Sequence, residues 1–182
     1  GTFIGTIRIY DEIVEDYIFR PNLPANVKTA YGKFDIKLGY VPGRKDSSLD
    51  DNVFKYFDDK LSAFGGLYIY RDDLRVLPYG RARTDFLNFE ERRTKSAGGY
   101  FFSYRRMFGY IDLNRMDNEA LRDKAGREGF INNKAFRDFR VHLEGLFLDL
   151  AKEYFGTNAK KDIKQSQLDK LKLAKASAKE EE

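Results

Sequence analysis

The chain has 182 residues, of which 42% are apolar and 15% aromatic, and its formal net charge is +4. This composition predicts a folded protein with a hydrophobic core and excludes an intrinsically disordered chain. Cysteine is absent and His142 is the only histidine, which excludes disulfides, thiolate metal sites and zinc sites built from histidines. We therefore predict no metal site. No apolar run reaches the roughly 20 residues that span a bilayer, and we expect a cytoplasmic protein with no membrane partner.

The first third of the chain predicts short strands joined by polar connections. Residues 5–10 predict a strand with Ile7 and Ile9 on one face, and alternating residues 34–38 predict a second, half-buried strand. The acidic segment 11–16 predicts a turn. Residues 42–51 predict a polar loop in which Ser48 or Asp50 caps a helix that ends at the two glycines 65–66. The apolar stripe of that helix consists of Val53, Tyr56, Phe57 and Leu61.

The middle of the chain predicts a hairpin followed by an irregular, charged segment. Two apolar alternating runs, at 67–69 and 74–76, flank the turn 71–73, and Pro78 closes the second strand. Residues 79–99 are irregular, with a single helical turn at 90–93. Residues 100–114 are aromatic and alternating, which predicts a long strand with an irregularity at Arg105 and Arg106.

The last third predicts a long amphipathic helix that anchors the fold. Asn133 is its expected N-cap and Gly156 its expected end. Its apolar stripe consists of Phe136, Phe139, Leu143, Leu146, Leu150 and Tyr154. Residues 158–182 show a further helical pattern with a thin apolar edge, and a fraying tail is the alternative interpretation. The order of strands and helices predicts the α+β class, with helices covering one face of a sheet.

The loop 121–133 is the most informative segment for function. It carries Lys124, Arg127 and two glycines between a predicted strand and the long helix. Glycine lets a backbone turn close to a ligand, and lysine or arginine supplies the charge that a phosphate needs. From spacing alone, a solvated connection explains the same residues. The paired carboxylates at 72–73 and 90–91 point apart in turns, so the residues by themselves form no complete active site.

A second hypothesis is a nucleic-acid-binding module. Its candidate residues are the arginine pairs Arg92 and Arg93, and Arg105 and Arg106, together with the lysines of the C-terminal segment. Together with the mild positive charge they predict salt-sensitive attraction to nucleic acid. The aromatic residues of the neighbouring segment 100–108 would provide stacking surfaces, although a strand that buries one aromatic face explains the same residues and is the favoured interpretation.

Residues 65–156 carry a set of motifs that resembles a known family. The set begins with Gly66 to Gly80 (GLYIYRDDLRVLPYG), continues through Asp85-Phe86-Leu87, Glu91-Arg92-Arg93, Gly109-Tyr110-Ile111 and Asp123-Lys124, and ends with Arg127-Glu128-Gly129-Phe130 and Ala135-Phe136. It resembles the second, transducer domain of the GHKL ATPases, which include the DNA gyrase B subunit, the MutL proteins, the heat-shock chaperones and the MORC proteins. Two departures are an Asp72-Asp73 turn where the family often has Asn-Gly, and Phe86 where tryptophan is common.

The resemblance implies a ribosomal protein S-five domain-2-like α+β fold and a role in ATP hydrolysis. In the family, ATP and Mg²⁺ are held by a preceding ATP-binding domain, and a transducer lysine reaches the terminal phosphate. Its position before the last helix matches Lys124, and Arg127 is the second candidate for contacting the nucleotide. The motifs of the ATP-binding domain are absent from this sequence and the first residue is Gly1, so we expect a fragment of a longer ATPase that is inactive alone.

The expected organisation has three parts. Residues 1–51 form strands and loops leading into the transducer, residues 52–156 form the transducer-like core, and residues 157–182 form a charged helical extension. The expected partners are the N-terminal ATP-binding domain of the same protein and a nucleic acid or client protein. A third interpretation is a structural interaction domain, in which the C-terminal helix pairs with its own copy to form a homodimer.

Overall fold

The computed structural model describes residues 1–9, 12–21, 28–41, 50–95, 101–126 and 128–155, together with residues 169 and 173. The strands are β1 (Phe3–Ile9), β2 (Glu12–Phe19), β3 (Asp35–Tyr40), β4 (Gly66–Arg71), β5 (Leu74–Arg75) and β6 (Met107–Leu113). The helices are α1 (Asp51–Phe64), α2 (Phe89–Lys95) and α3 (Lys134–Leu150), with a 3₁₀ turn η1 (Tyr104–Arg106) and a π-helical turn η2 (Ala151–Phe155) that continues α3.

Four strands form the main sheet, in the order β3-β6-β4-β5. The two central strands, β4 and β6, run parallel, whereas β3 and β5 are antiparallel to their neighbours. Because β4 and β6 are parallel, both begin at one end of the sheet and finish at the other. A segment that directly precedes or follows one of these strands therefore lies at the amino ends or at the carboxyl ends of both strands. The candidate sites described below are located by these two ends of the sheet.

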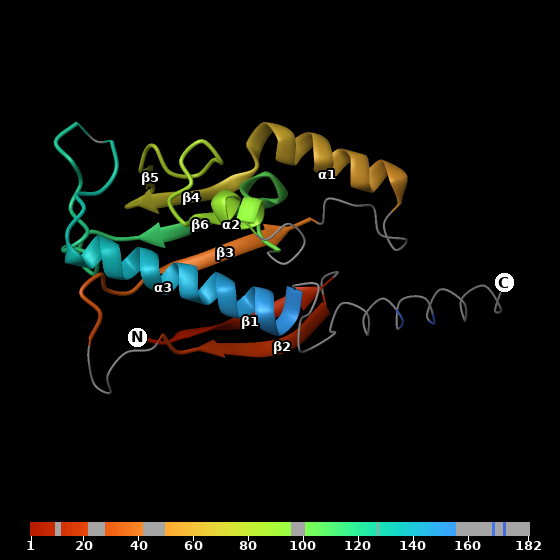
Figure 1. The fold of residues 1–182 in the computed structure, drawn as a ribbon, viewed down its shortest axis with the longest axis horizontal. Coiled ribbons are helices and arrows are strands. Elements are labelled where there is room, and N and C mark those ends of the chain that lie inside the picture. Colours follow the sequence, from red (N-terminus) through yellow and green to blue (C-terminus); the bar gives the residue numbers. More distant parts are fainter. Residues whose placement is uncertain are drawn as a thin grey trace.

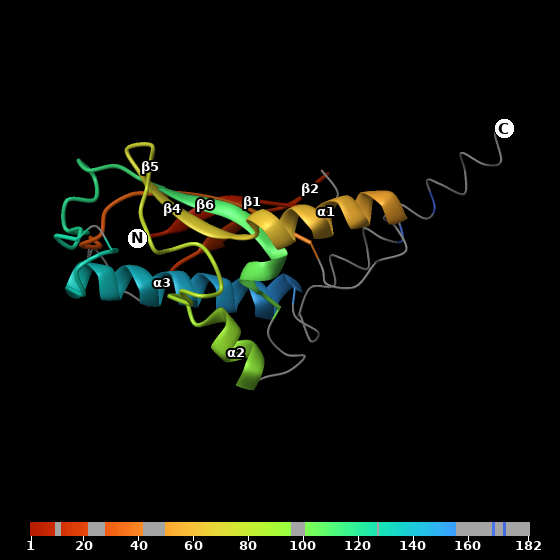
Figure 2. The ribbon, with the colours of Figure 1, turned by 90° about the horizontal axis from the view of Figure 1, so that it is seen from above.

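The long helix α3 lies along one face of the sheet, and α2 lies on the same side (Figures 1 and 2). The inner sides of α3 and of the central strands share one hydrophobic core, to which Ile69, Ile111, Phe139 and Leu143 contribute without exposed surface. On the opposite face of the sheet Phe108 is 57% exposed. The prediction of an α+β protein is confirmed, and the apolar stripe of the long helix packs as expected.

The first two strands form a hairpin that packs against α3 rather than joining the main sheet. Tyr17 is buried, and its hydroxyl donates a 2.6 Å hydrogen bond to Asp149 of α3. The predicted turn at residues 11–16 is wrong, because residues 12–16 belong to β2, where Asp16 pairs with Thr6. Acidic composition indicated a turn here, but it does not exclude a strand, because a strand of a surface hairpin can carry charged side chains on its exposed face.

Helix α1 is capped as predicted. The Asp50 side chain accepts a hydrogen bond from the Asn52 amide, and Gly65 follows the last turn. The helix projects beyond the end of the sheet, and its carboxyl end leads into β4 (Figure 1). Of its predicted stripe only Leu61 is buried, so the stripe is not the core-facing surface that its periodicity indicates. Periodicity establishes an apolar face but does not decide what that face contacts.

The hairpin of β4 and β5 is confirmed. Asp72 and Asp73 form its turn with positive φ angles of 49° and 65°, a conformation that aspartate adopts more readily than most residues. The predicted long strand at 100–114 is only partly right. Its regular portion is β6, and the irregularity expected at Arg105 and Arg106 is the 3₁₀ turn η1.

The first predicted segment, 1–51, supplies β3 to the sheet, where it pairs with β6 of the predicted core segment 52–156. Ile7, Tyr17 and Tyr31 also belong to the common core. The predictions for Arg127 and for the helical extension at 157–182 lie outside the described residues, apart from residues 169 and 173. No helix in the described part of the chain has both the length and the apolar content needed to cross a lipid bilayer.

Candidate functional site

Lys124 lies in a loop at the carboxyl ends of β4 and β6. Its side chain is exposed, and it forms no ion pair with any residue that the structure describes. The loop closes on itself through hydrogen bonds from the Lys124 amide to the Gly129 carbonyl, at 2.9 Å, and from the Ile131 amide to the Arg122 carbonyl, at 2.7 Å. The lysine is therefore presented to solvent from a hydrogen-bonded base.

Arg71, the last residue of β4, fastens that base to the sheet. Its side chain is 8% exposed and points under the loop. One guanidinium nitrogen lies 3.0 Å from Asp123 and another donates to the Leu121 carbonyl, while the guanidinium carbon lies 4.8 Å from the centre of the Phe130 ring. A buried arginine that uses its donors on both a carboxylate and a backbone carbonyl fixes the loop position tightly.

Tyr79 supports the second half of the loop, at Gly129 and Phe130. Its hydroxyl accepts a 2.9 Å hydrogen bond from the Phe130 amide, and its ring stacks on the Phe130 ring with centroids 5.5 Å apart. Burial raises the pKa of Tyr79. Gly129 has φ of +90°, and a Cβ there would lie 2.7 Å from the Tyr79 hydroxyl oxygen. The glycine of the REGF motif is thus required by this contact. Arg127, in the same motif, lies outside the described residues.

Arg92 is separated from the other predicted arginines. It points toward α3, where its guanidinium lies 2.9 Å from Glu144, and Asn88 donates to the same carboxylate at 2.9 Å. The Glu144 side chain is only 13% exposed. Arg92 therefore joins α2 to α3 through an ion pair, while 34% of its side-chain surface stays exposed.

Arg93, Arg105 and Arg106 do come together, on one cavity of about 600 Å³ at the amino ends of β4 and β6. The cavity is bounded on another side by the last turns of α1. Two further arginines, Arg81 and Arg83, line it as well. Sequence reasoning missed both, since they sit in the irregular segment after the hairpin. The only signal was arginine alternating with small residues in Gly80 to Arg83.

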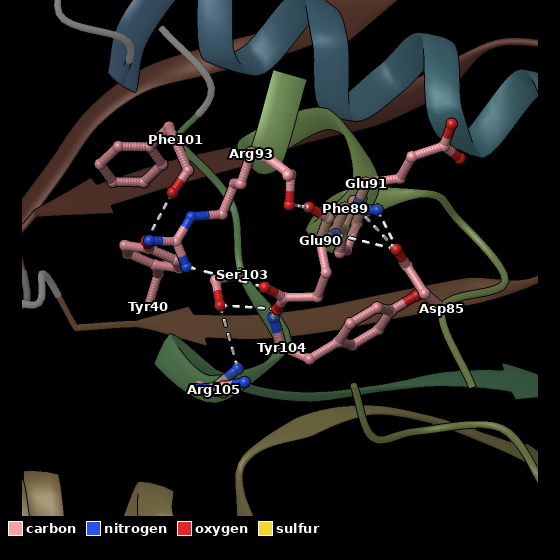
Figure 3. Close-up of polar contacts among 11 residues, drawn as sticks. Tyr40, Asp85, Phe89, Glu90, Glu91, Arg93, Phe101, Ser103, Tyr104 and Arg105 are labelled. Atoms are coloured by element: carbon pink, nitrogen blue, oxygen red, sulfur yellow. Dashed lines mark hydrogen bonds and ion pairs between the residues drawn. The ribbon is translucent and has the colours of Figure 1, made fainter. Parts of the chain in front are cut away.

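Figure 3 shows how the fold places Arg93 and Arg105. The Glu90 carboxylate accepts hydrogen bonds from the Ser103 hydroxyl, at 2.8 Å, and from the Tyr104 amide, at 3.1 Å, and it lies 3.8 Å from Arg93. The Ser103 hydroxyl oxygen in turn accepts from the Arg105 amide. One carboxylate thus joins α2 to η1 and brings the two arginines to the same place.

Asp85 organises the start of α2. Its carboxylate accepts hydrogen bonds from the amides of Phe89, Glu90 and Glu91 at 2.7–3.1 Å. These amides would otherwise lack partners in the first helical turn. The aspartate in the motif Asp85-Phe86-Leu87 therefore has a structural explanation. The run 90–93, predicted as one helical turn, belongs to the seven-residue helix α2.

The aromatic residues near these arginines do not form a stacking platform. Phe102 and Tyr104 are buried, and their rings pack against neighbouring rings of the core. Phe108 is exposed but belongs to β6, and Tyr100 lies outside the described residues. Core packing, the alternative reading of this segment, explains Phe102 and Tyr104.

Comparisons with known proteins add no assignment. No family model, no curated protein and no solved structure matches the chain. The resemblance to GHKL transducer domains accordingly rests on the motifs in the sequence. Among the described residues, no group of three or more histidine, aspartate or glutamate side chains is placed to hold a metal ion.

His142 is a half-buried residue of α3. Its ring lies 2.8 Å from the Tyr31 hydroxyl, measured at Nδ1, and packs edge-on against the Tyr31 ring. Burial lowers the pKa of His142, and the nearby Asp138 raises it to a smaller degree. Its contacts attach the segment before β3 to the long helix, which is a structural role.

Proposed function

We propose that this chain is the transducer region of a GHKL-type ATPase, with a ribosomal protein S-five domain-2-like fold, and that it supplies Lys124 to the terminal phosphate of ATP. The proposal starts from the motif set between Gly66 and Phe136. The observation that carries it is the exposed amine of Lys124 on a loop held to the sheet by Arg71. An exposed cation on a firmly held base suits contact with a group outside the domain.

The chemistry needs a fixed positive charge and a way to bring it close. As the terminal phosphoryl group leaves ATP, negative charge spreads over its oxygens, and a positioned cation stabilises that charge. ATP and Mg²⁺ would be bound by the preceding ATP-binding domain, while this chain contributes the lysine. Closure of the two domains would form the contact and release of phosphate would break it, so the same contact would act as a conformational switch.

The motif residues that flank Lys124 have structural roles consistent with this proposal. Tyr79 of the hairpin motif and Gly129 of the REGF motif contact one another beneath the loop. Motifs that are about 50 residues apart in the chain therefore support one lysine-bearing segment. The nucleic-acid hypothesis has less support, because Arg92 is engaged by Glu144 and two of its aromatic candidates are buried.

The test is ATP turnover by a protein that joins this chain to the ATP-binding domain that the proposal requires. Lys124→Ala should lower turnover by roughly 100-fold, the effect of losing one preorganised charge-stabilising donor. Its melting temperature should be unchanged, because the side chain is exposed. Arg122→Ala, an exposed cation two residues away, is the matched control and should retain turnover. Equal turnover in Lys124→Ala and wild type would contradict the role of Lys124.

A further inference from the structure

The arginine-lined cavity has a charge that the fold itself does not balance. Arg81, Arg83, Arg93, Arg105 and Arg106 line it, and the only acidic side chain among its described lining residues is Asp58. Five positive groups against one negative group leave a formal excess of four. Glu90 lies just outside the lining, 3.8 Å from Arg93, and counting it lowers the formal excess to three.

The local ion pairs compensate only part of that charge. Arg106 lies 2.5 Å from Asp58, and Arg93 lies a longer 3.8 Å from Glu90. Arg81 donates to the Ala63 carbonyl at 3.0 Å, which provides a hydrogen bond but no negative charge. Arg83 and Arg105 are exposed and form no ion pair with any residue in the described ranges. By contrast, Arg92, just outside the cavity, has the nearby carboxylate of Glu144.

Guanidinium groups that converge on a cavity have a defined chemical preference. Each is planar, permanently charged and able to give two parallel hydrogen bonds to a phosphate. A volume of about 600 Å³ lies in the range of small-molecule sites, so the hollow has room for a compact ligand. Tyr104 is the sole aromatic residue among the described lining residues, and at 1% exposed it offers no ring face for a base.

We propose that this cavity binds a compact ligand that carries several phosphate groups close together. Arg83 and Arg105 would be the principal contacts, since their guanidinium groups have no competing carboxylate among the described residues. Arg93 and Arg81 would add to them from the sides. The site does not depend on the ATPase proposal, because it needs no residue of the Lys124 loop.

The two cationic regions cannot share one small ligand. Gly65 and Arg106, which line the cavity, directly precede β4 and β6, whereas Arg71 at the end of β4 contacts the loop of Lys124. A strand of six residues spans roughly 20 Å at about 3.3 Å per residue. A ligand of the cavity is therefore separate from a nucleotide contacted by Lys124.

The experiment measures binding of inorganic triphosphate to the full chain by isothermal titration calorimetry. We compare wild type with the double variant Arg83→Gln and Arg105→Gln, and with Arg115→Gln and Arg122→Gln as a control. The control removes the same charge from exposed arginines at the other end of the sheet. The cavity variant should bind triphosphate roughly tenfold more weakly, or worse, for each arginine lost, and the control should bind like wild type.

A second variant protects the test against misfolding. Ser62 is an exposed lining residue on α1, and Ser62→Glu would add a carboxylate to the cavity without removing an arginine. It should raise the melting temperature in the absence of ligand, by relieving repulsion among the arginines, and abolish triphosphate binding. A merely structural arginine cluster would gain the stability but would have no triphosphate binding to lose.

Other outcomes overturn the proposal. Equal weakening in the cavity variant and the control would mean that triphosphate responds to overall charge only. Binding of citrate as tight as that of triphosphate would remove the preference for phosphate. Tighter binding of a short single-stranded or duplex oligonucleotide, lost in the cavity variant and steeply salt-dependent, would reassign the cavity to a nucleic-acid backbone.

Discussion

Arginine residues at the two ends of β4 and β6 have opposite environments. At the carboxyl ends Arg71 is buried, and its guanidinium contacts the Asp123 carboxylate, the Leu121 carbonyl and the Phe130 ring. At the amino ends Arg83 and Arg105 are exposed, around a cavity with one acidic lining residue in the described part of the chain. Arg71 uses its terminal guanidinium nitrogens on partners inside the fold, whereas exposed arginines without a paired carboxylate, such as Arg83 and Arg105, are suited to an anionic ligand.

The difference explains why the exposed Lys124 can be held so firmly. Arg71 and Tyr79 hold the loop from beneath, and the Lys124 side chain forms no ion pair with any described residue. At the other end Glu90 positions two of the arginines through the segment 103–105. Both ends therefore combine a buried or half-buried support with exposed cations.

The largest expected effect on stability follows from removing the support under the lysine loop. Arg71→Met keeps the aliphatic volume but loses the charged hydrogen bonds and the contact with Phe130. We expect the free energy of unfolding to fall by about 2–4 kcal/mol. Urea denaturation measures this. Arg75→Met is the matched control, because Arg75 is exposed and lies 4.5 Å over the Tyr68 ring, and it should cost less than about 1 kcal/mol.

A smaller loss of stability is expected when the hydroxyl group is removed from either of two buried tyrosines. The Tyr79 hydroxyl contacts the lysine loop at the carboxyl ends of β4 and β6, and Tyr104 lies at their amino ends. Tyr79→Phe removes the acceptor of the Phe130 amide and leaves a buried donor unpaired, which costs about 1–3 kcal/mol. Tyr104→Phe removes a longer contact, 3.3 Å from the Leu87 amide, and should cost less. Thermal unfolding of both variants checks the order. A greater loss for Tyr104→Phe would mean that the lysine loop is not the more tightly fastened end.

The smallest expected effect is a pH dependence of stability that comes from His142 on α3, a residue that belongs to neither candidate site. Burial lowers the pKa of His142 in the folded protein, so the unfolded chain takes up a proton first as pH falls. The stabilisation is complete above the unfolded pKa of about 6.5 and is lost as pH falls through the lower folded value. Wild type should therefore lose more stability than His142→Gln between pH 7.5 and pH 5, measured by thermal melting at each pH. An equal loss would contradict the lowered pKa.

Local patterns predicted the elements on which both regions depend. Asn133 caps α3, Asp50 caps α1, and the hairpin turn falls at Asp72 and Asp73, because each choice is governed by hydrogen bonds within a few residues. The same reasoning failed for residues 12–16, where pairing with β1 outweighs acidic composition. It also failed for the stripe on α1, since burial depends on a neighbour that periodicity does not describe.

The candidate sites show the same division. The sequence alone determined the α+β class, the main helix and a lysine in a glycine-bearing loop before that helix, since these follow from short-range preferences and from hydrophobic spacing. Only the tertiary structure turned Arg92 toward Glu144 and gathered Arg81 and Arg83 with Arg93, Arg105 and Arg106. The reason is physical: the parallel pairing of β4 with β6 decides which distant segments meet, and no local pattern encodes that pairing.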